Sequence, residues 1–381
     1  MRVDDYQDQA IASDQSKGQD TARYLLLGVF GEAGGLLTAV KKRERDAETI
    51  AKYLSQVTEE VGDLLWYLAT VASRNGVTLS TLVAPLIDPP PRRLDKIEFA
   101  DLQPLMTRVT PEPSRTFELR LVKLATAIGN LVSAQTESLH TRTKTSPNDE
   151  FTETFKWLES VASYVGVSLE DAALQNITKV RDRWPTRRIY TPAFDDAYPE
   201  YERLPRRMVI DIREVVPRKE QYFVLQTCEG LHVGDRLTDN IEDPDEYRFH
   251  DVFHYAYVAV LGWSPVVRAL LRLKRKSNKI VDETQDGARA NLIEEGIAAL
   301  VFAEAKSQAF FKNVKPGKLS FDLLKTIRGF VKGYEAEIIP LWLWEDAILQ
   351  GFEAFRFLQE NRAARVTISY TDRRLCVERH P

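Results

Sequence analysis

Apolar residues recur at intervals of three and four along two stretches between Thr21 and Ser73. This spacing puts apolar side chains on one helix face, so we predict two packed amphipathic helices. Gly76 is expected to end the second helix, and GVTLSTLVAPLI after it predicts a turn and a short helix. Residues 1–88 are therefore predicted to form one helical unit. The apolar positions are Leu26, Phe30, Leu36, Leu37 and Val40, then Val57, Val61, Leu64, Leu65, Leu68 and Val71.

The next segment, DPPPRRLDKIEFADLQPLMTRVTPEPS, contains prolines that exclude long regular elements, so residues 89–114 are predicted to be a linker. A second helical block, residues 115–185, ends in VASYVGVSLEDAALQ, which echoes VASRNGVTLSTLVAP of the first unit. We interpret the two blocks as diverged copies of one helical unit. The alternative is that two helix pairs share apolar spacing by accident.

Superposing the echoing segments gives both acidic residues of the first unit's second helix an acidic counterpart. The glutamate of its first helix has no such counterpart, so the first copy is the better equipped for chemistry. The paired positions are Gly166 on Gly76, Glu150 on Glu60, Glu153 on Asp63, and Ala127 at the place of Glu32.

After Pro185 the pattern changes to the alternation of apolar and β-branched residues that is typical of strands. RRMVIDIREVV and QYFVLQTCEGLHV show it, as does ARVTISYTDRRLCVER near the end, which predicts two strands joined at 371–373. These segments are predicted to share one small sheet, with helices between 247 and 361. Residues 186–381 are thus expected to form an α+β domain that is mostly α, and the fold class is mainly α.

The composition, with 44% apolar and 28% charged residues among 381, is typical of a folded chain of two or three domains. The net charge of −4 gives no global attraction to nucleic acid or to an anionic membrane. Cys228 and Cys376 cannot make a disulfide framework, and neither a signal peptide nor a run of eighteen apolar residues is evident. We expect a cytoplasmic protein without a membrane partner.

Three carboxylates are the first candidate site. Glu60 and Asp63 lie three residues apart on one helix face, and Glu32 would meet them if the two helices pack antiparallel. Carboxylates within an apolar stripe are costly to bury without a partner, and their oxygens suit Mg²⁺, with Mn²⁺ as an alternative. The other interpretation is that all three are solvated surface charges.

The segments GEAGGLL, EEVGDLLWYLA and GVTL resemble the MazG-type all-α nucleoside triphosphate pyrophosphohydrolases, whose signature is E-E-x-x-E on one helix and E-x-x-D on the next. Glu32, Glu60 and Asp63 match it, and the resemblance implies a tandem MazG-like bundle in which they bind metal and catalyse. Gly31 and Gly35 stand at two glutamate positions, and the second departure removes an expected ligand. The candidates for the missing oxygen lie in the second copy, at Glu150 and Glu153.

The segment NITKVRDRWP is similar to the tail that closes many family domains, where Lys and Arg lie close to the substrate phosphates. By this resemblance Lys179 and Arg183 are candidate phosphate contacts, and Lys41 and Lys42 have the same standing. The implied reaction is attack of water on the α–β linkage of a nucleoside triphosphate, giving the monophosphate and pyrophosphate. For each basic residue the alternative is a solvated helix face.

A second candidate site is RFHDVFHYAYVAVLGWSP, in which His250 and His254 stand four apart on a predicted helix. Two histidines with one or two carboxylates predict a transition-metal site, whereas the alternative is ordinary hydrogen-bonded helix residues. The carboxylates in question are Asp251, Glu294 and Glu295.

The run RALLRLKRKSNK, residues 268–279, holds six basic residues and no acid, which indicates a local phosphate- or nucleic-acid-binding surface or a solvated helix face. This third block resembles the helical C-terminal domain attached to some MazG-type proteins, for which the resemblance implies no named activity. The resemblance marks the following candidate residues here: Arg248, Lys274, Arg275, Asp286 and Arg289.

Two functions follow from these patterns. The first is a Mg²⁺-dependent nucleotide pyrophosphohydrolase with an accessory C-terminal domain. The second is a catalytically degenerate bundle that serves nucleotide sensing or dimerisation, with any chemistry in the C-terminal His/Glu cluster or with nucleic acid bound by the basic run. A homodimer is open in both cases.

Overall fold

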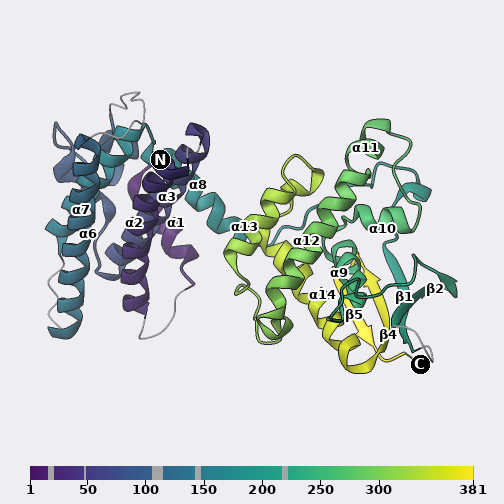
Figure 1. Ribbon diagram of the computed structural model, residues 1–381. Coiled ribbons are helices and arrows are strands. Elements are labelled where there is room, and N and C mark those ends of the chain that lie inside the picture. Colours follow the sequence, from purple (N-terminus) through teal and green to yellow (C-terminus); the bar gives the residue numbers. More distant parts are fainter. Residues whose placement is uncertain (16–20, 47–48, 105–114, 142–146, 217–221, 381) are drawn as a thin grey trace. The chain divides into compact units, whose positions relative to one another are not determined.

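The computed structural model describes residues 1–15, 21–46, 49–104, 115–141, 147–216 and 222–380. It divides into two compact units, Met1–Thr186 and Arg187–Pro381, each with a buried apolar core of its own. The fold is mainly α with one small antiparallel sheet in the second unit, which confirms the predicted fold class (Figure 1).

The first unit is a helical bundle. Helix α2 packs on α3, α6 packs on α7, and α8 lies against α3. Apolar residues at helical spacing, such as Val57, Val61 and Leu68 of α3, are fully buried between these helices. The elements are α1 (Val3–Ser13), α2 (Thr21–Asp46), α3 (Ile50–Arg74), α4 (Leu79–Val83), η1 (Ala84–Leu86), η2 (Leu94–Lys96), α5 (Phe99–Leu102), α6 (Arg115–Thr141), α7 (Asn148–Val165) and α8 (Leu169–Arg183).

The turns after α3 and α7 are built alike. Each has a glycine with positive φ, Gly76 at +72° and Gly166 at +76°. In each, a glutamine side chain accepts a hydrogen bond from the first amide of the next helix and donates to a turn carbonyl. Gln7 does this for the first turn and Gln103 for the second, an equivalence that supports an internal duplication of the helical unit.

The segments that precede these glutamines also pair with each other, through an isolated bridge between Arg2 and Glu98. Val3 N donates to Ile97 O at 3.0 Å and Phe99 N to Met1 O at 3.1 Å. Ile97, Phe99 and Leu102 are buried. The second copy therefore extends back into the segment predicted to be a linker, and part of that prediction, residues 105–114, lies outside the described residues.

Helix α2 carries a segment, Ala22–Arg43, that is long and apolar enough to cross a membrane by length and composition. The helix is apolar on two sides. Leu25, Val29 and Leu36 are buried in the unit, whereas Leu27 and Phe30 are 63% and 55% exposed. One third of the most apolar stretch of this segment is buried inside the unit.

The second unit is built around a five-stranded sheet of order β3-β2-β1-β4-β5, antiparallel throughout. Strands β4 and β5 come from the end of the chain and pair beside β1, which confirms the prediction that the two ends of this block share one sheet. The strands are β1 (Arg207–Val215), β2 (Phe223–Cys228), β3 (Leu231–His232), β4 (Ala363–Ser369) and β5 (Arg374–Glu378).

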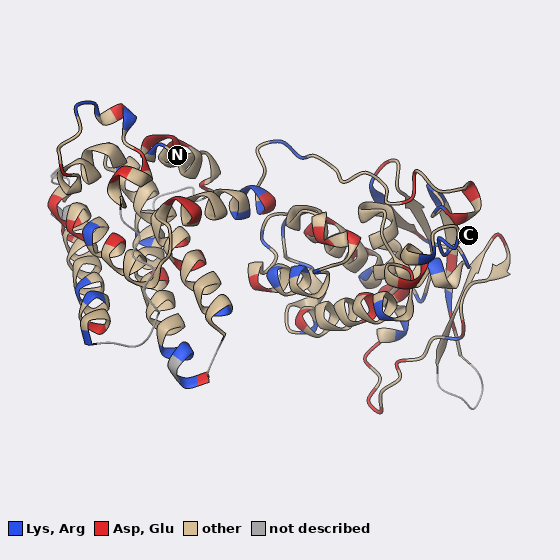
Figure 2. Ribbon diagram, turned by 90° about the horizontal axis from the view of Figure 1, so that it is seen from above, with Lys and Arg blue, Asp and Glu red and all other residues tan. Residues whose placement is uncertain are grey.

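The central helix of this unit is α14, which packs against α9, β4 and β5 (Figure 1). Acidic and basic positions are interspersed over the helices and strands of each unit (Figure 2). The helical elements are η3 (Glu200–Glu202), η4 (Tyr247–Phe249), α9 (Asp251–Ala256), η5 (Tyr257–Leu261), α10 (Pro265–Leu270), α11 (Lys279–Thr284), α12 (Ala288–Lys306), η6 (Ala309–Phe311), α13 (Phe321–Phe330), η7 (Glu335–Ile338) and α14 (Leu341–Asn361).

Candidate functional sites

Glycines on α2 set how closely it approaches α3. A Cβ built on Gly35 would lie 2.2 Å from Glu60 Oε2, and one on Gly28 would lie 2.1 Å from the Tyr67 ring. These contacts define an antiparallel register between α2 and α3. In the same register Glu32 stands opposite Asp63, midway between the two contacts.

The three carboxylates of α2 and α3 interact. The Glu32 carboxyl donates a hydrogen bond to the Glu60 carboxylate. Burial, followed by the charges of Asp63 and Glu60, raises the pKa of Glu32 to about 8. Burial also raises the pKa of Glu60 and of Asp63. Near neutral pH the cluster therefore retains a proton, and it is a place where added positive charge would be favourable.

Helix α8 closes this cluster. Lys179 Nζ lies 2.5 Å from both Asp63 oxygens and 3.2 Å from Glu59 Oε1. Asn176 Nδ2 donates to Asp63 Oδ1 at 2.8 Å, and the Tyr6 hydroxyl donates to Asn176 Oδ1 at 3.3 Å. Asp63 is thus fixed from two sides by residues that lie more than a hundred positions later in the chain.

The glycine at position 35 has a steric reason. The space that a side chain would occupy there is filled by the Glu60 carboxyl group, which folds against the α2 backbone. A glutamate at this position would have to push Glu60 aside. The chain thus has one carboxylate at this place where the family signature would have two.

The other residues predicted to contact phosphate lie differently. Lys41 and Lys42 are exposed near the end of α2, about 14 Å along the helix axis from Glu32 at 1.5 Å per residue. Arg183 is only 2% exposed, with its guanidinium 5.5 Å from the Trp184 ring. The alternative that Arg183 lies on a solvated helix face is therefore wrong. Of these four residues, Lys179 contacts the carboxylate cluster.

Glu153, the counterpart of Asp63 in the second copy, is bonded elsewhere. It accepts hydrogen bonds from Lys156 and Trp157 of its own helix and is 47% exposed. The expectation that Glu153 supplies the missing oxygen is wrong in this structure, and the same expectation for Glu150 stays a prediction.

Two contributors to the cluster were not among the residues singled out from the sequence. Glu59 shares Lys179 with Asp63, and Asn176 orients Asp63. Asn176 precedes Lys179 by three residues, so the helical spacing of NITK was a signal for placing both on one face.

The second unit brings five of its candidate residues together. His250, at the start of α9, and His254, one turn later, face Glu294 and Glu295 of α12. Glu294 is fully buried and accepts hydrogen bonds from Ser264 and from the Val266 amide as well. Asp251 Oδ1 lies 3.3 Å from His250 Nε2.

The charges within this cluster are strongly coupled. Burial alone would favour neutral imidazole, yet the Glu294 and Glu295 carboxylates outweigh it and raise the pKa of His254. Burial is the main cause that lowers the pKa of His250. For Glu295, burial is outweighed by the two histidines, and the pKa of the carboxyl falls.

Comparison with known proteins bears on this second unit. The family described as the MazG C-terminal domain matches residues 189–381, just over half of the chain. The chain belongs to the MazG C-terminal domain family. It is also 36% identical over 61 residues to the Gene 37 protein of Mycobacterium phage L5, a match that spans 16% of this chain and 54% of that protein. No solved structure matches.

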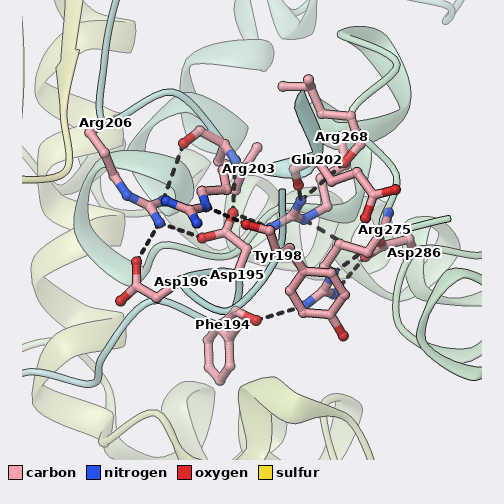
Figure 3. Close-up of polar contacts among 12 residues, drawn as sticks. Phe194, Asp195, Asp196, Tyr198, Glu202, Arg203, Arg206, Arg268, Arg275 and Asp286 are labelled. Carbon is pink, nitrogen blue, oxygen red and sulfur yellow. Dashed lines mark hydrogen bonds and ion pairs between the residues drawn. The ribbon is translucent and has the colours of Figure 1, made fainter. Parts of the chain in front are cut away.

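Within this MazG C-terminal domain, the basic run is not a uniform surface. Arg268 is buried and pairs with Asp195, and Arg275 is buried and pairs with Asp286 (Figure 3). Arg275 also pairs with Glu335. The expectation that residues 268–279 form a solvated basic face is wrong, and Arg275 is not accessible to a nucleic acid. A contact through the exposed members of the run stays a prediction. Those members are Arg272, Lys276 and Lys279.

The remaining candidates of this domain lie outside the histidine cluster. Arg248 is buried and forms ion pairs with Glu214 and Asp239. Asp286 belongs to the Arg275 network, Lys274 is half-buried, and Arg289 is exposed in the first turn of α12. Arg248 and Asp286 therefore have structural ion-pairing partners within the domain.

Proposed function

We propose that this chain is a Mg²⁺-dependent nucleoside triphosphate pyrophosphohydrolase whose active site is the cluster of Glu32, Glu60 and Asp63. The observation that supports it is the convergence of three half-buried carboxylates from two helices. Burial, and after it the charges of Asp63 and Glu60, raise the pKa of Glu32 to about 8. Perturbed pKa values of this kind are typical of functional sites.

The donor set fits a hard divalent ion. Carboxylate oxygens are the ligands that Mg²⁺ and Mn²⁺ prefer, and the cluster offers them from Glu60, Asp63 and Glu32. When bound, such an ion polarises the phosphoryl oxygens and lowers the pKa of a coordinated water.

The chain's own residues have distinct roles in this proposal. Glu32 holds a proton in the ion-free cluster, and its carboxylate, once deprotonated, would accept a proton from the attacking water. Asn176 keeps Asp63 in one orientation. Lys179 contacts Asp63 and Glu59 in the structure, and its ammonium group would donate to the phosphate oxygens of the substrate.

Membership of the MazG C-terminal domain family supports the proposal, because that domain takes its name from MazG-type proteins. Gly35 reduces the number of metal ligands that the site offers. The family signature has two acids at this place, whereas this chain has the carboxyl group of Glu60 alone.

The experiment measures pyrophosphate and monophosphate released from a panel of canonical and modified nucleoside triphosphates with Mg²⁺. Glu60→Gln and Asp63→Asn should lower the rate at least about 100-fold, because each removes charge that the reaction needs. Glu153→Gln is the matched control, since it changes the counterpart of Asp63 in the second copy.

Release that is undiminished in both site variants would overturn the proposal. Tight nucleotide binding without turnover by the wild-type protein would also overturn it, and would favour the degenerate, nucleotide-sensing bundle. Circular dichroism of each variant establishes that a lost activity is not a lost fold.

A further inference from the structure

The second unit contains a cluster whose geometry is that of a metal centre. Among the described residues, the ligand atoms of His250, His254 and Glu295 all lie within 4.8 Å of one another. His254 Nε2 is 3.4 Å from Glu295 Oε2, and His250 Nε2 is 3.8 Å from the same oxygen. Two ligands held about 2.0–2.1 Å from one ion lie about 2.8–3.4 Å apart at octahedral or tetrahedral angles. The 3.4 Å spacing falls in this range, and the 3.8 Å spacing is wider by about 0.4 Å.

Both imidazoles are oriented so that the same ring nitrogen faces the centre. His250 Nδ1 lies 2.8 Å from the Tyr247 carbonyl, and His254 Nδ1 lies 2.8 Å from Glu294 Oε1. Each Nδ1–H thus donates away from the centre, and in the neutral form of each ring the Nε2 lone pair points into it. Metal-binding histidines typically have this arrangement, with the second nitrogen held by a carbonyl or a carboxylate.

An unsatisfied buried atom points to a missing ligand. His254 is 0% exposed, and its Nε2 has no hydrogen-bond partner. Leaving a buried polar nitrogen without a partner costs about 1–3 kcal/mol, so such atoms need an explanation. An ion at the centre would provide one.

The two adjacent glutamates have different positions. Glu294 is fully buried and is held by Ser264 Oγ at 2.7 Å and by the Val266 amide at 2.8 Å, so it orients His254. The Glu295 side chain is 43% exposed and faces both Nε2 atoms. The centre therefore opens to solvent on the side of Glu295, as sites with exchangeable water ligands do.

We infer that His250, His254 and Glu295 form a binding site for a divalent first-row transition metal ion, with Glu294 as the residue that positions His254. Two imidazole nitrogens and one carboxylate oxygen select Mn²⁺, Fe²⁺, Co²⁺ or Zn²⁺ over Mg²⁺ and Ca²⁺, which prefer oxygen ligands throughout. Asp251, with Oδ1 3.3 Å from His250 Nε2, offers a further oxygen next to the site. This inference does not depend on the proposed pyrophosphohydrolase.

The competing arrangement is a protonated His254 held between Glu294 and Glu295, without a metal. It leaves unexplained why His250 also directs its Nε2 toward Glu295. The two arrangements differ in a measurable way, because a site for a metal binds it with a fixed stoichiometry, whereas a buried ion pair binds none.

The test uses the full chain after treatment with a chelator. Co²⁺ or Zn²⁺ is titrated by calorimetry with Mg²⁺ in excess to occupy the carboxylate cluster of the first unit, and the Co²⁺ complex is followed by its visible absorption. The wild-type protein should bind about one equivalent, with Co²⁺ bands typical of mixed nitrogen and oxygen ligands. His250→Gln and Glu295→Gln should each weaken binding at least about tenfold.

Glu304→Gln, which changes an exposed carboxylate on the same helix α12, is the matched control and should bind as the wild type does. His254 is fully buried, so a variant at this position can fail to fold. Glu295 is half-exposed, so its replacement tests the site without removing a core side chain. Absence of stoichiometric binding, or binding unchanged in both His250→Gln and Glu295→Gln, would overturn the inference.

Discussion

Replacing Glu32 by glutamine removes a carboxyl group whose affinity for a proton increases when the chain folds. Its carboxyl pKa is raised from an ordinary 4.5 to about 8 in the folded protein. The folded state therefore holds the proton more tightly than the unfolded state does. The stability that this group contributes is fully present below pH 4.5 and is lost as the pH rises through 8.

The size of the effect follows from the shift. At about 1.4 kcal/mol per pKa unit the shift corresponds to a ceiling of roughly 5 kcal/mol. Because Glu32 is only half-buried, screening by solvent reduces the expected loss to about 1–2 kcal/mol between pH 5 and pH 9. Glutamine keeps a donor for the hydrogen bond to Glu60 and does not titrate.

The assay is urea unfolding in the presence of a chelator at several pH values, with hydrogen exchange of α3 peptides to report on the first unit. Glu32→Gln should gain about 1–2 kcal/mol over the wild type at pH 9 and much less at pH 5. Glu118→Gln, an exposed position on α6, should show no such trend. A difference between Glu32→Gln and wild type that is the same at both pH values would refute the reasoning.

Three further variants test other parts of the structure. Gly35→Ala puts a Cβ into the carboxyl group of the facing helix and should cost about 1–3 kcal/mol in thermal melts, whereas Gly34→Ala meets nothing within 4 Å and should be neutral or stabilising. Arg275→Met leaves Asp286 and Glu335 without their guanidinium partner and should lower the free energy of unfolding in urea by about 3–5 kcal/mol. Arg272→Met, the control, should change it by close to zero, and equal effects of the two variants would contradict the buried network. Lys179→Met should raise the KM for the triphosphate at least about tenfold in steady-state kinetics, and an unchanged KM would remove its phosphate role.

Local patterns made much of the fold predictable. Two patterns in the sequence show which side chains face a core. They are the helical spacing of apolar residues in α3 and α7 and the alternation of apolar residues in β1, β2, β4 and β5. The small sheet that joins both ends of the second unit was predicted for the same reason. The start of the second copy was missed because α5 is a single turn held by Gln103 and by pairing with Met1–Val3, which are long-range contacts.

The sites were predictable only as far as helical spacing extends. Spacing placed Glu60 near Asp63 and His250 near His254, because residues three or four apart share a helix face. It could not show that Lys179 lies on Asp63, or that Glu60 fills the space at Gly35, since these contacts depend on how separate helices pack. The basic run was misread for a related reason. Its charge is visible in the sequence, but the acids that bury Arg268 and Arg275 lie 11 to 73 residues away.

The central claim concerns the three carboxylates of α2 and α3, and a crystal structure with Mn²⁺ and a non-hydrolysable nucleoside triphosphate tests it most directly. Anomalous scattering would locate the ion without assumptions about its identity. The account predicts an ion about 2.0–2.3 Å from oxygens of Glu60, Asp63 and Glu32, next to the triphosphate, with Lys179 moved from Asp63 to a phosphate. A triphosphate bound elsewhere, or carboxylates that keep Lys179 and bind no ion, would contradict it.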